Sequence, residues 1–164
     1  MTAPRVSALY RTAFVTGAST GLGRAFAEML LAEGVSVWGT ARDPARLAPL
    51  AGHRAFTAVA LDLRDGARAE EVFHAAAQTA GGFDLVVNNA GYGVFGDFAA
   101  TDFSVWQEQL EVMLLNTARL SHAALRDLRA RPAAGRPARS STSRRSRWSS
   151  PCRSRAPTTW PRPA

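Results

Sequence analysis

The chain has 164 residues, of which 46% are hydrophobic and 20% charged, a composition typical of one folded domain with a sizeable core. The sequence has no apolar run long enough for a membrane span, no hydrophobic signal segment in residues 1–11, and no disulfide partner for its one cysteine, Cys152. We therefore expect a cytoplasmic protein that has neither a membrane anchor nor a disulfide framework, although its net charge of +7 would favour a polyanionic partner.

The basic charge is concentrated near the C-terminus. All 20 basic residues are arginine, and the sequence contains no lysine. Residues 1–125 hold 9 arginines and 12 acidic residues, whereas residues 126–164 hold 11 arginines and one acidic residue, Asp127. The net charge is therefore a property of the last segment and says little about the rest of the chain.

Strands and helices are predicted to alternate along residues 1–130. Four short β-rich runs are predicted as strands, at residues 12–16, 35–40, 55–61 and 84–88. Amphipathic or alanine-rich segments are predicted as helices, at residues 21–33, 66–80 and about 102–129, with a short helix beginning at Asp43 and Pro44. Strands separated by such helices form right-handed βαβ units. We predict an α/β fold with an incomplete, doubly wound parallel sheet of these four strands.

Residues 131–164 have a different composition and form a separate segment. They contain six of the nine prolines, and apart from alanine their hydrophobic residues are Trp148, Cys152 and Trp160. Such a segment cannot bury enough apolar surface to offset the entropy lost on ordering. We expect a disordered Arg/Ser/Pro-rich tail after a domain formed by residues 1–130.

A glycine-rich turn lies between the first predicted strand and the first predicted helix. Residues 16–23 read T-G-A-S-T-G-L-G, and the glycines permit a tight turn whose N–H groups can approach a pyrophosphate at the helix N-terminus. The spacing G-x-x-x-G-x-G differs from the common G-x-G-x-x-G pattern. Taken alone, this turn is equally compatible with a loop that binds nothing.

Two further segments give the turn a context. N-N-A-G at residues 88–91 follows the fourth predicted strand, and Asp62 follows the third. Over residues 10–130 the chain resembles the classical short-chain dehydrogenase/reductase family. The resemblance implies a Rossmann-like domain and hydride transfer between NAD(P)(H) and a small alcohol or carbonyl substrate. It also implies a homo-oligomer in the full-length form, with no specific nucleic-acid partner and no membrane association.

The resemblance assigns roles to individual residues. It implies three groups of cofactor-binding residues: a phosphate loop, an adenine contact, and a support for the sheet beside the adenosine. These are, in turn, Thr16, Gly17, Ser19, Gly21, Leu22 and Gly23; Asp62 and Leu63; and Asn89, Ala90 and Gly91. It also implies that Asn116 anchors a water in the proton relay. A helical asparagine bonded to neighbouring backbone is the alternative for Asn116.

The end of the second predicted strand indicates the choice of cofactor. An acidic residue there would bond the ribose 2′-OH of NAD, whereas an arginine can pair with the 2′-phosphate of NADP. The chain reads Thr40-Ala41-Arg42-Asp43, and we interpret Asp43 as the cap of the next helix. We therefore predict NADP(H) in preference to NAD(H), bound through Arg42 with Thr40 as an additional donor.

Other types of site find no support in the sequence. His53, His74 and His122 lie on separate elements without metal-ligand spacing, so no metal site is predicted. A phosphate-binding loop of the G-K-[ST] type is also missing.

The family's proton donor is missing as well. The resemblance implies a Tyr-x-x-x-Lys pair and a Ser after the long helix, yet Tyr10 and Tyr92 both precede its end and the chain has no lysine. We expect the chain as written to be inactive. The alternatives are a non-catalytic dinucleotide-binding fragment or a basic-tailed nucleic-acid-associated protein.

A frameshift would explain both the tail and the missing residues. When residues 139–164 are back-translated and read from each third base, the permitted codons include V-V-N-V-S-S-V-A-V-V-L-A-L-P-I-P-G-A-Y-H-M-A-K-A. The Tyr codon would straddle Pro157 and Thr158, and the Lys codon Pro161 and Arg162, which requires an AGA or AGG codon for Arg162. Our hypothesis is one lost base near residues 131–139.

Overall fold

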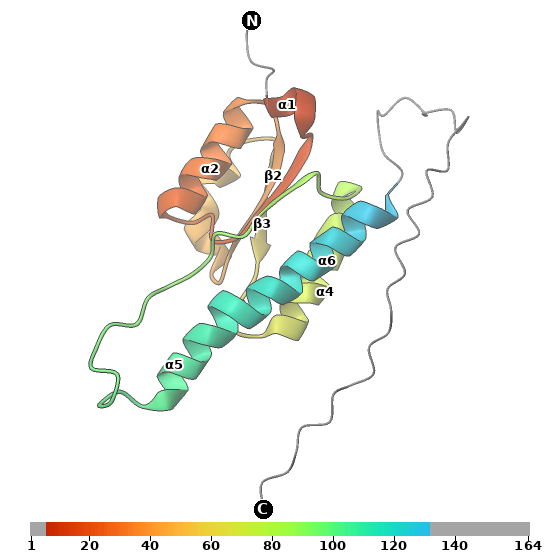
Figure 1. The fold of residues 1–164 in the computed structure, drawn as a ribbon. Helices are drawn as coiled ribbons and strands as arrows, with labels where there is room; N and C mark the ends of the chain where they lie inside the picture. The colour runs from red at the N-terminus through yellow and green to blue at the C-terminus, as the bar shows by residue number, and fades with distance from the viewer. Residues whose placement is uncertain (1–5, 132–164) are drawn as a thin grey trace, which may run out of the picture. The chain divides into compact units, whose positions relative to one another are not determined.

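Four parallel strands form the sheet in the computed structural model, which describes residues 6–131 (Figure 1). Their spatial order is β3-β2-β1-β4. The strands are β1 (Thr12–Val15), β2 (Ser36–Ala41), β3 (Phe56–Ala60) and β4 (Leu85–Val87). Phe14 lies opposite Trp38 on one side and Val86 on the other. The order reverses between β1 and β4, and a ligand crevice is expected beyond the carboxyl ends of strands at such a reversal. The predicted α/β class and parallel sheet are confirmed.

The helices confirm the main predictions and add detail. They are α1 (Val6–Leu9), α2 (Gly21–Ala32), the 3₁₀ turn η1 (Pro44–Leu47), α3 (Ala48–Ala51), α4 (Gly66–Ala80), α5 (Phe103–Leu110), the π-helical segment η2 (Glu111–Asn116) and α6 (Thr117–Ala130). The single helix predicted over about 102–129 is thus α5, η2 and α6 in succession. Apolar periodicity does not reveal the one turn of π-helix, since it changes the backbone hydrogen bonding and leaves the composition of the helix unaltered.

Each face of the sheet is covered by helices. α2 packs on one face, where Ala13 and Val15 of β1 are fully buried. α4 and α6 cover the other face, as Figure 1 shows, and there Phe14 joins Phe73 and Phe83 in an aromatic cluster with ring centroids 5.1–5.6 Å apart. Alternate residues of β1 therefore enter two cores, which holds the strand firmly and fixes the loop that follows it.

Glycine and aspartate residues define several helix ends, among them the cap at Asp43 that the sequence predicted. Gly81 ends α4 in the left-handed conformation, with φ +73°. Asp43 begins η1, and its Oδ1 accepts a hydrogen bond from Ala45 N at 3.0 Å. Asp65 begins α4 in the same way by accepting from Arg68 N at 2.9 Å.

The predicted tail lies almost wholly outside the described residues. Residue 131 is the last one described, so the expectation of disorder beyond it stays a prediction. Within the described part of the chain, every helix is too short or too polar to cross a membrane.

Candidate functional site

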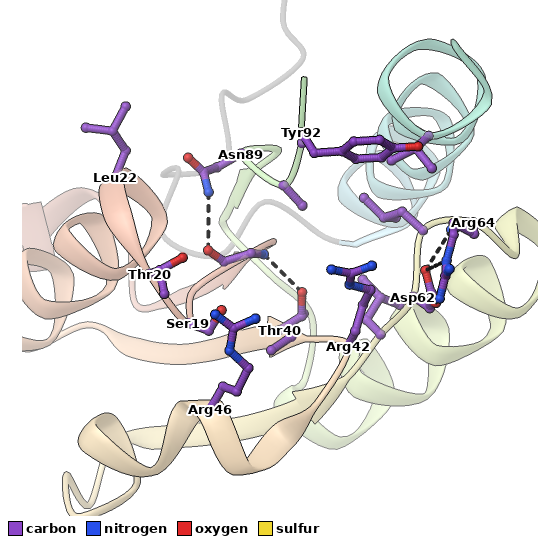
Figure 2. Close-up of a pocket in the computed structure, with 17 residues that line it drawn as sticks. Ser19, Thr20, Leu22, Thr40, Arg42, Arg46, Asp62, Arg64, Asn89 and Tyr92 are labelled. Atoms are coloured by element: carbon purple, nitrogen blue, oxygen red, sulfur yellow. Dashed lines mark hydrogen bonds and ion pairs between the residues drawn. The ribbon is translucent and has the colours of Figure 1, made fainter. Parts of the chain in front are cut away.

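A cleft of about 380 Å³ opens at the carboxyl ends of the strands (Figure 2). Most of the residues predicted to bind a cofactor line it, namely Gly17, Ser19, Leu22, Thr40, Arg42, Asp62, Leu63, Asn89, Ala90 and Gly91. The other lining residues, which were not predicted to bind the cofactor, are Thr20, Ala41, Arg46, Leu61, Arg64, Tyr92 and Val112. The fold thus brings together segments that follow all four strands, and η2 adds Val112.

Thr16 is predicted with the phosphate loop, but its side chain faces the sheet. It is 1% exposed, and its Oγ1 accepts hydrogen bonds from Asn89 N at 2.9 Å and Ala90 N at 3.0 Å. The same hydroxyl donates to Val87 O at 3.3 Å. Thr16 therefore joins the end of β1 to the end of β4 and shapes the cleft from behind.

The glycines of the loop allow its close packing. Gly17 has φ +68°, and a Cβ there would come within 2.9 Å of Ala90 Cα. A Cβ on Gly23 would overlap both Gly17 O and Asn89 Nδ2. By contrast, Gly21, at φ +58°, has open space where a Cβ would be. The chain can turn sharply here because these positions carry no side chain.

The start of α2 offers free N–H groups beside this loop. Thr20 is the N-cap residue, yet its side chain makes no capping hydrogen bond. The first N–H groups of a helix have no intrahelical partner, and the helix dipole favours an anion near them. A bare glycine loop, unpartnered N–H donors and an open cleft together fit the diphosphate of a dinucleotide.

Polar side chains gather where β2 ends. Thr40 is 1% exposed and its Oγ1 accepts a hydrogen bond from Gly17 N at 3.3 Å, so it supports the loop. Asp43 is engaged as the cap of η1. Arg42 and Arg46 are both exposed, and Figure 2 shows both side chains directed toward the cleft. Within residues 6–131 neither guanidinium lies within ion-pair distance of a carboxylate.

Asp62 is held in an ion pair at the end of β3. Arg64 Nε donates to Asp62 Oδ2 at 2.9 Å, and Arg64 N donates to Asp62 Oδ1 at 3.0 Å. The hydrogen bond from the Arg64 side chain is the main cause that lowers the pKa of Asp62 below its ordinary value. The carboxylate is therefore ionised at neutral pH and fixed beside Leu63.

Tyr92 is the cleft's tyrosine, and its hydroxyl is already engaged. It donates to Glu108 Oε1 at 2.9 Å. Partial burial, followed by the hydrogen bond and the negative charge of Glu108, raises the pKa of Tyr92. A phenol of raised pKa beside a carboxylate holds its proton and is poorly suited to giving it to a substrate.

Asn116 does not line the cleft itself, but it bonds to Leu63, which does. Its Nδ2 donates to Leu63 O at 2.8 Å, and the side chain lies in a second hollow between α4 and the η2–α6 helix. The residue is 9% exposed. The amide thus bonds to backbone, as the alternative interpretation expected, but to backbone that is distant in the sequence. The role of Asn116 in holding a relay water stays a prediction.

Comparisons with known proteins agree with this geometry. The model of the short chain dehydrogenase family matches residues 11–136. Among curated proteins, an uncharacterized oxidoreductase of Schizosaccharomyces pombe is 32% identical over 127 residues, which are 77% of this chain and 43% of that protein. An oxidoreductase of Botryotinia fuckeliana is 36% identical over 119 residues, or 71% of this chain and 43% of that protein.

Solved structures show the same similarity. A short-chain dehydrogenase of Streptomyces avermitilis superposes with a TM-score of 0.69 at 37% identity, covering 73% of this chain and 44% of that one. The L-sorbose reductase of Gluconobacter frateurii, solved with NADPH and L-sorbose, gives a TM-score of 0.67 at 30% identity, covering 73% of this chain and 48% of that one. The chain spans about half the length of the curated relatives it matches. The fold, the cleft and the matched residues show that the chain belongs to the short-chain dehydrogenase family of oxidoreductases.

Proposed function

We propose that the cleft binds NADP(H) in preference to NAD(H). The observation that carries this proposal is the end of β2, where Asp43 is engaged as a helix cap and Arg42 points toward the cleft. An acidic residue free to bond a ribose 2′-OH would favour NAD, whereas a guanidinium suits a phosphate. Two of the similar structures, a chicken carbonyl reductase and the L-sorbose reductase, were solved with NADPH.

Different residues of the cleft would bind different parts of the cofactor. The loop of Gly17 to Gly23 and the start of α2 would hold the diphosphate, and Asp62 with Leu63 would border the adenine. Asn89 and Gly91 would line the adenosine side. When bound, the nicotinamide supplies or accepts the hydride in the interconversion of an alcohol and a carbonyl compound, the reaction we propose for the whole protein.

The chain as written lacks a suitable proton donor for that reaction. Tyr92 retains its proton beside Glu108, and Tyr10 does not line the cleft. The sequence has no lysine that could lower the pKa of a tyrosine. We therefore propose that the 164-residue chain binds the cofactor without turnover.

A frameshift remains our proposal for the origin of this deficiency. The match to the family model ends at residue 136, inside the short range where we place the lost base. Sequencing the gene across codons 125–164 tests it directly. A restored frame that encodes Ser and Tyr-x-x-x-Lys would support the proposal, and a confirmed frame as written would refute it.

The exposed apolar residues of the long helix support a homo-oligomer of the full-length protein. Leu110, Leu114 and Leu115 are 55–62% exposed on α5 and η2. Apolar residues exposed together often mark a protein–protein contact.

Titrating the purified 164-residue chain with NADPH and NADH tests the cofactor proposal. Reduced nicotinamide fluorescence reports binding, and we expect NADPH to bind at least about tenfold more tightly, since one charge-assisted phosphate contact is worth about that much. Equal affinities, or tighter NADH, would refute the preference. Absence of binding by either dinucleotide would refute the site.

A further inference from the structure

Arg46 is a cleft-lining cation that the resemblance does not assign. It lies on η1, four residues after Arg42, and its own N–H donates to Asp43 O at 3.2 Å. The neighbouring Leu47 is 1% exposed in the core, which anchors the 3₁₀ turn against the sheet. The backbone that carries both arginines is therefore fixed, and each side chain starts from a defined position at the cleft.

The acidic groups near the two arginines are engaged elsewhere. Asp43 Oδ1 accepts from Ala45 N at 3.0 Å, and Asp62 is paired with Arg64 at 2.5 Å. In the part of the chain that the structure describes, neither Arg42 nor Arg46 forms an ion pair. Two positive charges thus line the same cleft, and the carboxylates near them are already bonded to other donors, an arrangement that a bound anion would stabilise.

Hydroxyl donors complete this end of the cleft. Ser19 and Thr20 line it from the phosphate loop, and the side chain of Thr20 makes no capping hydrogen bond. Thr40 also lines the cleft, and because its Oγ1 accepts from Gly17 N, its O–H remains available as the additional donor that the sequence predicts. Arg46 is the exposed cationic donor that remains beside Arg42.

We propose that Arg46 and Arg42 together hold the ribose 2′-phosphate, so that Arg46 is a second determinant of cofactor specificity. The inference rests on the proposed binding of NADP(H). A phosphate monoester carries close to two negative charges at neutral pH, and two guanidinium groups match that charge where one would leave part of it unpaired. Each guanidinium can also offer parallel N–H donors to phosphate oxygens.

Adenosine 2′,5′-bisphosphate and adenosine 5′-monophosphate are suitable probes, because they differ only in the 2′-phosphate, which the first carries and the second lacks. Their dissociation constants are measured by calorimetry on the full chain and on Arg46→Ala. We expect the preference for the 2′,5′-bisphosphate to fall by roughly tenfold, the value of a charge-assisted contact, with little change in the affinity for the monophosphate. The preference of Arg46→Lys should lie between that of the unaltered chain and that of Arg46→Ala, because lysine keeps the charge and loses the planar donor pair.

Arg54→Ala is the matched control, because Arg54 is exposed, does not line the cleft and carries the same charge. A nucleotide preference in Arg46→Ala equal to that of Arg54→Ala would overturn the inference and leave NADP(H) binding intact. Equal binding of both probes by the unaltered chain would overturn the inference together with the cofactor preference. Failure to bind either probe would overturn the proposed site itself. These outcomes are distinct, so failure of the inference can be told from failure of the proposed function.

Discussion

Two turns at the same edge of the sheet are closed by the same device, a glycine packed against an asparagine amide from a distant segment. In the loop after β1, Gly23 lies against Asn89, whose Nδ2 donates to Thr16 O at 3.0 Å. The amide thereby ties the loop after β1 to the segment after β4. No side chain larger than hydrogen fits at Gly23, because a Cβ would meet backbone as well as the amide.

The turn after β3 repeats this arrangement with other residues. Gly66, the first residue of α4, lies against Asn116, whose Nδ2 donates to Leu63 O at 2.8 Å. A Cβ on Gly66 would overlap Asn116 Oδ1. Here the amide comes from the π-helical segment η2 and holds the backbone of the turn that borders the cleft.

The difference between the two turns lies in what can give way. At Gly23 the obstacle includes the carbonyl of Gly17, which belongs to the loop itself, whereas at Gly66 it is the end of a side chain that can rotate. The first turn is therefore rigidly specified, whereas the second can yield at the amide of Asn116. We expect substitutions to affect the first more strongly.

Gly23→Ala should have the largest effect. The new methyl group would force the loop away from Asn89, and we expect the free energy of unfolding to fall by about 3 kcal/mol, as for other overpacked sites. NADPH affinity should fall by more than about tenfold, because the N–H groups of the loop would move. Urea denaturation followed by circular dichroism, together with NADPH titration, measures both.

Gly52→Ala is the control for this substitution. Gly52 has φ −74° and open space around its Cα, so a methyl group there should leave the stability and the affinity unchanged. If Gly23→Ala behaved like Gly52→Ala, the close packing of the loop would not be what specifies the site.

Gly66→Ala should have a smaller effect, a loss of about 1–2 kcal/mol of unfolding free energy. The methyl group would displace the amide of Asn116 and break its bond to Leu63 O, leaving a partly buried carbonyl unpaired. Asn116→Ala should cost about the same, because it removes the same bond. Urea denaturation of both single variants tests these values.

The double variant tests whether the two residues act together. Once Asn116 is alanine, the methyl group at Gly66 meets no amide, and alanine is the better helix former, so Gly66→Ala should then be neutral or slightly stabilising. Losses that simply add in the double variant would show that the contact does not close this turn.

The same comparison shows what the sequence could reveal. The residues of the first turn belong to two short sequence motifs, T-G-x-x-x-G-x-G and N-N-A-G. Its glycines and Asn89 were therefore predicted from spacing and resemblance. The four strands and three main helices followed from local periodicity. These features depend on nearby residues, which is why a single sequence suffices to predict them.

The second turn could not be predicted in this way. Asn116 bonds to a residue 53 positions away, and its placement depends on the π-helical turn of η2. The resemblance assigned it to a proton relay, whereas the structure engages its amide with Leu63 O. Arg46 was missed for a similar reason. It lies four residues after Arg42, across a capped 3₁₀ turn, and this spacing does not by itself predict that both side chains line one cleft.

The smallest expected effect concerns the charge at the second turn. The pKa of Asp62 is lowered chiefly by its hydrogen bond with Arg64, so this pair stabilises the fold above the carboxyl group's ordinary pKa near 3.8, and the stabilisation is lost as pH falls through the lowered pKa. Both side chains are more than a third exposed, so solvent screening keeps the contribution of this pair small. Arg64→Ala should therefore be slightly less stable than the unaltered chain at pH 7 and equal to it near pH 2.

Arg68→Ala is the matched control, since Arg68 pairs with Glu71 on the exposed side of α4, where its side chain is 69% exposed. We expect almost no change from it at either pH. The pH dependence then distinguishes the two interactions that hold the turn. The Asp62–Arg64 ion pair is lost at low pH, whereas the bond from Asn116 to Leu63 joins neutral groups and does not titrate. A loss in Arg64→Ala at pH 7 larger than that in Asn116→Ala would mean that charge holds this turn. In that case the similarity to the loop after β1 would be one of shape alone.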